Sequence, residues 1–195
     1  MGLIEKMFET GAVRMGPSRT DPSRQVATFD PAAIGRLAAD RRTALEAFRW
    51  LEGAWTYENP VPATRLSPAY CDVGTAVFAP DSGGSWICRV APDGQAIPLI
   101  TFDPWSQQWI YVLTHGSYGV LRAPGWQDDR IAFTGTMTML GVTCEWRMTW
   151  TRHDPDAFAF VNEERAPDGS WSYIDEWRYR RTTTPPGEPP ARLPR

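Results

Sequence analysis

Hydrophobic and polar residues alternate one by one along the C-terminal third of the chain. Residues 142–151 read VTCEWRMTWT, so that every second side chain is apolar. The same period of two runs through residues 131–139, 158–164 and 171–179. Successive side chains of a β-strand point to opposite faces, so these four segments are predicted to be half-buried strands.

Turn sequences separate short apolar segments throughout residues 53–181. Examples are PDSGG at 80–84, APDGQ at 91–95 and APDGS at 166–170. Strands and turns at this spacing are typical of an antiparallel sandwich or barrel, and no helical pattern interrupts them. We therefore expect an all-β fold with ten antiparallel strands, at about 53–58, 72–79, 85–91, 97–102, 108–114, 117–123, 130–139, 142–152, 157–165 and 171–181.

One amphipathic α-helix is predicted ahead of the strands, over residues 30–52. Asp30 suits the cap of its N-terminus, and Pro31 suits the first helical position, where a missing N–H needs no partner. Apolar residues then recur at helical spacing on one face: Ile34, Leu37, Ala38, Leu45 and Phe48. Residues 1–29 are expected to form a flexible arm with one short helical turn, and the Pro-rich residues 182–195 a tail.

Composition and charge narrow the function classes. Hydrophobic residues make up 42% of the chain and 10 residues are Trp, which is enough for a large aromatic core. The formal net charge of -3 argues against a nucleic-acid partner bound through phosphate contacts. No apolar run is long enough to span a membrane and the N-terminus does not read as a secretory signal, so we expect a cytoplasmic protein without membrane contact.

The sequence predicts no metal site and no cofactor. The three cysteines are widely and irregularly spaced, without a CxxC motif, and are expected to be reduced and buried. His115 and His153 lie far apart and form no cluster of metal-ligand spacing.

An apolar face of the predicted sheet carries a small polar patch. If the last hairpin closes at APDGS, Asn162 lies opposite Asp175 and Phe160 lies opposite Trp177. Glu164 belongs to the same face, and Met148 of the preceding strand lies near Asn162.

Two interpretations of this patch remain open at the level of sequence. A carboxylate on an aromatic face must be hydrogen-bonded or its pKa will rise, and Asn162 and Tyr173 could satisfy Asp175 within the protein. The same groups could instead orient a polar atom of a bound molecule. A slip of one residue in the face assignment would bring Glu176 and Arg178 inside in their place.

Several motifs resemble a known family. Gly53-Ala54-Trp55 follows the predicted helix and begins the first strand, as the G-x-W signature does in lipocalins. The segments LEGAW, FDPWSQQWIY, GWQDDRIAFTG and PDGSW extend this pattern over residues 45–181, which resemble small bacterial lipocalin-like proteins of the calycin superfamily whose function is unknown.

The resemblance implies an up-and-down barrel that holds one small ligand. It also implies a structural pair in which a basic side chain of the last strand, Arg178 or Arg180, packs over the indole of Trp55. The distantly related nitrobindin-like barrels bind haem through a late His. No His follows His153 here, so we expect no haem.

The leading hypothesis is a binding protein for a small hydrophobic or aromatic molecule. Its expected ligand-binding residues share the inner face of the barrel or its rim: Tyr111, His115, Met137, Trp146, Met148, Asn162, Glu164, Tyr173, Asp175 and Trp177. The alternative is a cofactor-free isomerase, cyclase or lyase with Asp175 or Glu164 as general acid–base and His115 or Tyr111 as its partner; Asp175 and His115 are the preferred pair. A third hypothesis is that the terminal arms pack across a homodimer.

Overall fold

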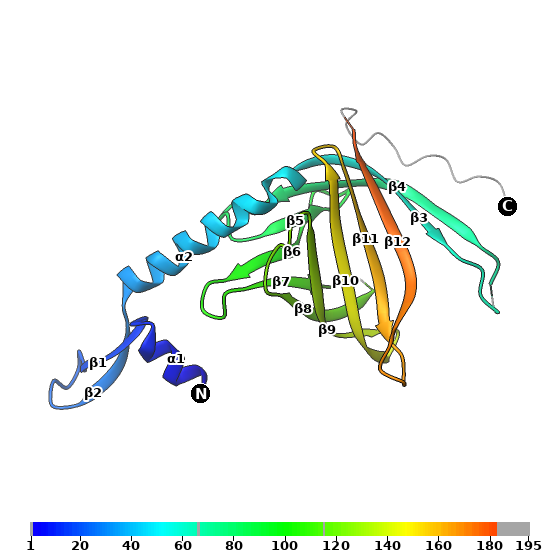
Figure 1. Cartoon of the computed structure of the whole chain (residues 1–195). Coiled ribbons are helices and arrows are strands. Elements are labelled where there is room, and N and C mark those ends of the chain that lie inside the picture. The colour runs from blue at the N-terminus through cyan, green and yellow to red at the C-terminus, as the bar shows by residue number, and fades with distance from the viewer. Residues whose placement is uncertain (1, 66, 115, 183–195) are drawn as a thin grey trace.

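Strands β3 to β12 pair with one another in chain order and close into a barrel (Figure 1). The structure is a computed structural model, and it describes residues 2–65, 67–114 and 116–182. The strands of the barrel are β3 (Gly53–Val61), β4 (Tyr70–Pro80), β5 (Ile87–Val90), β6 (Ala96–Asp103), β7 (Gln108–Leu113), β8 (Ser117–Ala123), β9 (Arg130–Met139), β10 (Val142–Asp154), β11 (Ala157–Arg165) and β12 (Trp171–Arg181).

All strand pairs of the barrel are antiparallel, and β12 closes it by pairing with β3. The prediction of an all-β, ten-stranded up-and-down barrel behind a helix is therefore confirmed. The predicted register of the last hairpins is also observed, because Asn162 lies opposite Asp175 and Met148. Alternation with a period of two was enough to align these strands because one face of each is buried.

One β-bulge interrupts the last hairpin and changes which residues face inward. The register between β11 and β12 shifts after Asn162, so that Glu163 lies opposite Tyr173 and Ile174 is left without a partner. Tyr173 consequently points outward and is 53% exposed. The expectation that Tyr173 lines the inner face was wrong, since an extra residue reverses the alternation beyond it.

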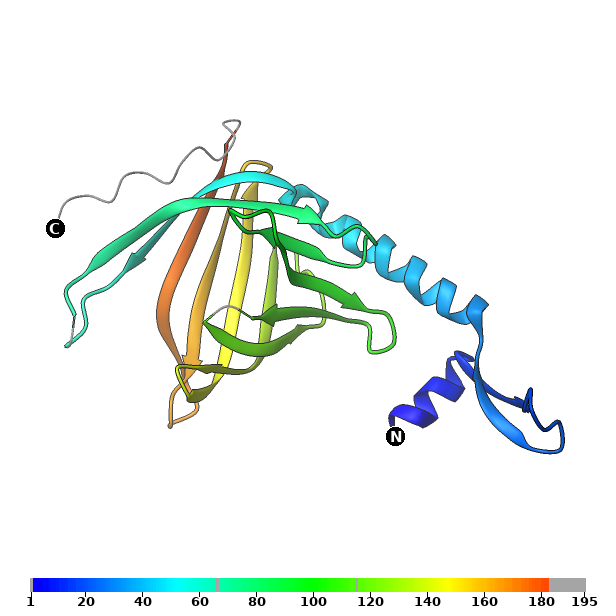
Figure 2. The same ribbon diagram turned by 180° about the vertical axis from the view of Figure 1, so that it is seen from behind.

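The hairpin of β3 and β4 runs beyond its neighbours on both sides. β12 pairs with β3 only from Arg178 to Arg181, and β5 pairs with β4 only over Val77–Pro80. Figures 1 and 2 show the far end of this hairpin projecting away from the other strands. The distal parts of β3 and β4 thus pair with each other but have no strand neighbour along their other edges among the described residues.

A buried aromatic cluster fills the end of the barrel that lies next to the helix. It combines side chains from the helical segment and from the strands: Phe48, Trp50, Trp55, Trp126, Trp150 and Phe158. Phe48, Leu51 and Trp55 have no exposed surface. We call these six aromatic residues the closed-end cluster, and their burial accounts for much of the Trp content of the chain.

The predicted helix is present as α2 (Pro31–Leu45), which continues into a 3-10 helix, η1 (Glu46–Leu51). The Asp30 carboxylate caps it by accepting a hydrogen bond from the Ala32 N–H at 3.0 Å. Its C-terminal end and η1 bury Leu45 and Phe48 in the barrel, and Arg41 Nε donates to the carbonyl of Phe102 at 2.9 Å. Ile34 at the other end is 41% exposed, so the apolar face is not buried along its whole length.

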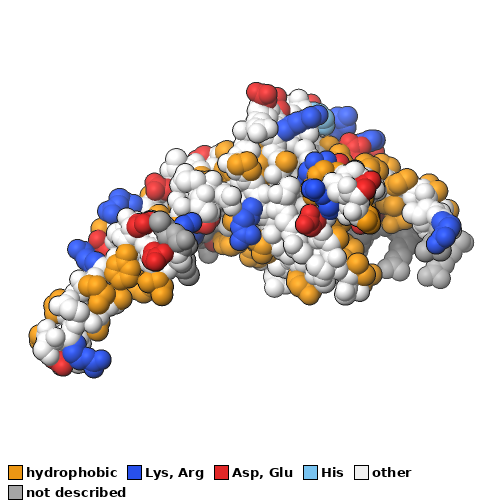
Figure 3. Space-filling view, turned by 60° about the horizontal axis from the view of Figure 1, so that its bottom comes forward, with side chains coloured by type: hydrophobic (Ala, Val, Ile, Leu, Met, Phe, Trp, Pro, Cys, Tyr) orange, Lys and Arg blue, Asp and Glu red, His pale blue; other side chains and the backbone are white. Residues whose placement is uncertain are grey.

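The N-terminal arm has regular structure that the sequence did not predict in full. Helix α1 (Leu3–Glu9) corresponds to the expected helical turn, and strands β1 (Val13–Pro17) and β2 (Gln25–Phe29) form an unexpected hairpin. The arm lies at the far end of α2 from the barrel (Figures 1 and 2). Hydrophobic side chains gather on the surface of the arm in Figure 3. The exposed large hydrophobic residues of this segment are Ile4, Phe8, Met15 and Phe29.

Candidate functional site

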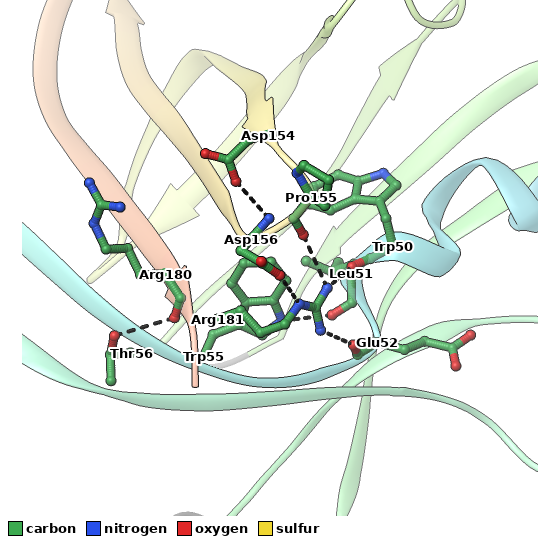
Figure 4. Close-up of polar contacts among 10 residues, drawn as sticks. All are labelled: Trp50, Leu51, Glu52, Trp55, Thr56, Asp154, Pro155, Asp156, Arg180 and Arg181. Atoms are coloured by element: carbon green, nitrogen blue, oxygen red, sulfur yellow. Dashed lines mark hydrogen bonds and ion pairs between the residues drawn. The ribbon is translucent and has the colours of Figure 1, made fainter. Parts of the chain in front are cut away.

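Arg181 packs over Trp55 at the closed end of the barrel (Figure 4). Its guanidinium carbon is 4.3 Å from the centroid of the indole. It donates hydrogen bonds to the carbonyls of Glu52 (2.7 Å) and Trp50, and to a carboxylate oxygen of Asp156 (2.9 Å). The indole N–H of Trp55 donates in turn to the Leu51 carbonyl at 2.8 Å.

The expectation that Arg178 or Arg180 forms this pair was therefore wrong. Arg181 lies opposite Trp55 in the closing ladder, whereas Arg178 lies opposite Glu58 on the outer face. There Arg178 Nε donates to Glu176 at 2.9 Å. The sequence pattern could have identified Arg181, because every second residue of a strand lies on the same face and Arg181 follows the inward-facing Trp177 and Tyr179 at this spacing.

A chain of three hydrogen bonds joins four side chains on the inner wall formed by β10, β11 and β12. The indole N–H of Trp146 donates to Asn162 Oδ1 at 3.2 Å. Asn162 Nδ2 donates to Asp175 Oδ1 at 2.7 Å, and the indole N–H of Trp177 donates to Asp175 Oδ2 at 3.2 Å. Asn162 is 7% exposed, so its amide and the Asp175 carboxylate are held in fixed orientations by partners within the protein.

Three tyrosines extend this wall: Tyr57 on β3, Tyr111 on β7 and Tyr179 on β12. The ring of Tyr57 is 5.1 Å from that of Trp177 and 5.7 Å from that of Tyr179. It lies across Gly74, where an added Cβ would come within 2.6 Å of the Tyr57 hydroxyl. A glycine at this position of β4 therefore lets the Tyr57 ring lie flat against the backbone.

The hydroxyls of Tyr111 and Tyr179 border accessible space. Both residues are only 6% exposed, and burial raises the pKa of both phenols well above its ordinary value. Among the described residues, neither hydroxyl has a hydrogen-bond partner, yet only Nε1 of Trp126 is both sealed from solvent and unpartnered. Each hydroxyl oxygen thus keeps some accessible surface although its ring is buried.

Arg89 is a cation on the inner face of β5. It lies opposite Phe78, which is 4% exposed and packs 6.1 Å from the Tyr179 ring. Side chains directly opposite each other in a ladder share a face, so Arg89 points inward, and it is exposed there. An exposed side chain on the inner face requires that the interior opens to solvent beside it.

The sequence analysis selected three of the inner-face polar residues described above. Asn162 and Asp175 were predicted to lie opposite each other, and Tyr111 was predicted to be a ligand-binding residue. The structure places Asn162, Asp175 and Tyr111 on the same inner face as Tyr57, Arg89 and Tyr179, which the sequence analysis did not select. We call these six residues the interior polar site. Arg89 and Tyr57 were missed because the hydrophobic alternation of β3 and β5 is too weak to assign their faces.

The remaining predicted site residues are spread over different parts of the barrel. Met137 and Met148 are buried on the inner wall, where the Trp150 indole N–H lies 2.9 Å from Met148 Sδ. Glu164 is exposed at the far end of β11. His115 lies outside the described residues.

Nothing in the described part of the chain brings together three or more His, Cys, Asp or Glu side chains in a metal-binding arrangement. No helix among the described residues is long and apolar enough to cross a membrane.

Cys88 is buried, as expected, but Cys71 is exposed and Cys144 is partly exposed, so the expectation of three buried thiols was wrong.

Fold and interior together define a closed antiparallel β-barrel with a buried aromatic end and an interior polar site. Among solved structures, the chain is similar to Rv2717c from M. tuberculosis, with 12% identity, coverage of 71% of this chain and 97% of that chain, and a TM-score of 0.45. It is also similar to a redesigned β-barrel, b11L5F_LGL, with 14% identity, coverage of 75% and 96%, and a TM-score of 0.33. No family model and no curated protein matches the sequence. The barrel class therefore rests on the strand pairing itself.

Proposed function

We propose that the barrel binds a small hydrophobic or aromatic molecule at the interior polar site. The observation that carries the proposal is the pair of buried phenols, Tyr111 and Tyr179, whose hydroxyls border accessible space without a partner among the described residues. Buried polar groups in proteins are almost always hydrogen-bonded, so two such hydroxyls on an apolar wall are suited to meet a ligand or its water.

The wall around these hydroxyls supports an apolar guest. The partly exposed rings of Trp177 and Tyr57, 5.1 Å apart, supply aromatic surface for a flat ligand, and the buried Trp146, Met137 and Met148 belong to the apolar core of the same barrel. The indole N–H groups of Trp146 and Trp177 donate to Asn162 and Asp175, respectively. These hydrogen bonds fix the position of the Asn162–Asp175 pair on the wall. A ligand would gain affinity from apolar contact and orientation from the hydroxyls.

The alternative of a cofactor-free enzyme has no specific observation in its favour. Both carboxylate oxygens of Asp175 accept hydrogen bonds from Asn162 and Trp177. His115, its suggested partner, lies outside the described residues.

Calorimetric titration with the neutral aromatic probe 2-naphthamide tests the proposal. We expect saturable binding at one site per chain, weakened about five- to tenfold in Tyr111→Phe, which deletes one hydroxyl and keeps the ring. Tyr118→Phe is the matched control, because Tyr118 is 69% exposed and should leave the affinity unchanged.

Native mass spectrometry of the protein purified without added ligand provides an independent measurement. A co-purified mass would identify the ligand class directly. Absence of both a co-purified molecule and any binding of 2-naphthamide would contradict the proposal.

A further inference from the structure

Arg89 is the cation of the interior polar site, and it makes no ion pair among the described residues. The six ion pairs found there involve Arg14, Arg49, Arg147, Arg178 and Arg181 with nearby carboxylates, but not Arg89. Arg89 nevertheless points inward, opposite the buried Phe78. A guanidinium on the inner face of a barrel with no paired carboxylate has hydrogen-bonding capacity left for a guest.

Arg89 shares the inner face of the barrel with three phenols. The ring of Phe78, which lies opposite Arg89, is 6.1 Å from that of Tyr179, and the Tyr179 ring is 5.7 Å from that of Tyr57. The positive charge of Arg89 lowers the pKa of Tyr57, Tyr111 and Tyr179, in each case against a larger rise caused by burial. The influence of one cation on the pKa of all three phenols agrees with this shared face, although the rings come from three different strands. A guanidinium fork beside phenolic O–H donors matches the planar, two-oxygen geometry of a carboxylate.

Two carboxylates of the protein lie near this cation and limit the charge that it can accept. Asp175 contributes to the electrostatic environment of Tyr179, but its oxygens already accept hydrogen bonds from Asn162 and Trp177. Asp72 on β4 raises the pKa of Tyr57 and is exposed to solvent. A ligand with several negative charges would meet repulsion from both, whereas a single acidic group can be held on the Arg89 side.

We propose that the ligand of the barrel is an aromatic or aliphatic acid with a single carboxylate, which Arg89 binds with help from the hydroxyls of Tyr57, Tyr111 and Tyr179. This inference rests on the proposed function and narrows its ligand class. The apolar part of the acid lies against the partly exposed rings of Trp177 and Tyr57. The acidic group lies toward the solvent-exposed guanidinium, where the cost of removing its charge from water is smallest.

The test compares two probes that differ in charge and share one ring system, 2-naphthoate and 2-naphthamide, by calorimetric titration at about pH 7. We expect the wild-type protein to bind 2-naphthoate at least about tenfold more tightly than 2-naphthamide, because hydrogen bonds to an ionised acceptor are stronger. Raising the salt concentration should reduce this preference, since the guanidinium is exposed.

Arg89→Gln should remove the preference for the acid, so that 2-naphthoate and 2-naphthamide bind with similar affinity. The matched control is Arg122→Gln on β8, whose side chain is exposed between the buried, inward-facing Leu121 and Ala123 and so lies on the outer face. This control should keep the full preference. Circular dichroism verifies that each variant is folded.

The outcomes separate this inference from the proposed function. Equal affinity of the wild-type protein for acid and amide would overturn the anionic ligand and leave the binding function standing. A preference that survives in Arg89→Gln would overturn the role of Arg89. Failure to bind either probe would count against the proposed function itself. If Arg89→Gln does not fold, the wild-type protein provides the test. Tighter binding of 2-naphthoate than of 2-naphthamide, reduced by added salt, supports the inference, and a preference that does not change with salt overturns the role of the exposed guanidinium.

Discussion

Arg181 on the last strand and Trp55 on the first strand of the barrel form a cation–π pair, with the guanidinium carbon 4.3 Å from the indole centroid. The guanidinium also satisfies the carbonyls of Trp50 and Glu52, at the end of η1. One side chain thus joins the closing strand, the first strand and the helical segment that covers the barrel end (Figure 4).

Replacing Arg181 by Ala is expected to lower the free energy of unfolding by about 2–4 kcal/mol, because it removes the cation–π contact and leaves two carbonyls without their donor. Arg178→Ala, at a side chain that is 58% exposed, should change it by less than about 0.5 kcal/mol. Chemical denaturation followed by Trp fluorescence measures both. Equal effects of the two substitutions would show that Arg181 does not hold the closed end.

The Asn162 amide joins Trp146 to Asp175 inside the barrel. Asn162→Ala should destabilise the protein by about 2–3 kcal/mol, since it leaves a buried indole N–H without its acceptor and a carboxylate without a donor. Glu164→Gln on the same strand, at an exposed position, serves as the control and should have an effect below about 0.5 kcal/mol. A stability loss in Asn162→Ala no greater than that of the control would contradict the role assigned to this chain of contacts.

Gly135 lies at a close approach of β8 and β9. An added Cβ would be 2.5 Å from the Val120 carbonyl oxygen and 3.2 Å from the Leu121 Cα, and neither backbone atom can move without disturbing the ladder. Gly135→Ala is therefore expected to cost at least about 2 kcal/mol.

Gly35→Ala provides the matched control for Gly135→Ala. Gly35 lies within α2, an added Cβ there meets nothing within 4 Å, and the substitution should stabilise the helix by about 0.5–1 kcal/mol. Thermal and chemical denaturation of both variants measure the difference. Opposite signs are expected, and a neutral Gly135→Ala would contradict the backbone clash.

Burial raises the pKa of Tyr111 and Tyr179 above the ordinary value of 10.0. The folded protein therefore holds these protons more tightly than the unfolded chain, and their contribution to stability is complete below about pH 10. It is lost as the pH rises further, because the unfolded phenols ionise first and unfolding becomes favourable.

Denaturation between about pH 8 and about pH 11, with tyrosinate absorbance as a second signal, tests this pH dependence. Tyr179→Phe should flatten the alkaline loss of stability, whereas Tyr118→Phe, at a ring that is 69% exposed, should not. An unchanged alkaline profile in Tyr179→Phe would show that this phenol does not contribute.

The N-terminal arm packs mainly on itself, through the pairing of β1 with β2 and the backbone hydrogen bond from Asp30 N–H to the Ala12 carbonyl. Deletion of residues 1–29 is therefore expected to change the free energy of unfolding of the barrel by less than about 1 kcal/mol. Light scattering on both chains tests the homodimer hypothesis as well. If the arm forms the dimer, the particle mass measured for the full-length protein is twice the mass of one chain. The particle mass of the truncated protein is then that of one chain.

The amino-acid sequence by itself determined the ten strands of the barrel and their order. Alternation in residues 131–179 and the spacing of the turns predicted the antiparallel barrel, and the APDGS turn predicted that Asn162 faces Asp175. These features are local: a buried face sets the alternation along each strand, and a short turn sets the register of the hairpin that it closes.

Only the tertiary structure decided which residue closes the barrel and which residues face its interior. The pairing of β12 with β3 joins segments more than a hundred residues apart, as in the contact of Arg181 with the Glu52 carbonyl, so no local turn sets its register. The bulge at Ile174 turned Tyr173 outward, and the ladder of β4 and β5 placed Arg89 inside. Such choices depend on how the whole sheet curves and packs, which a period of two along one strand does not encode.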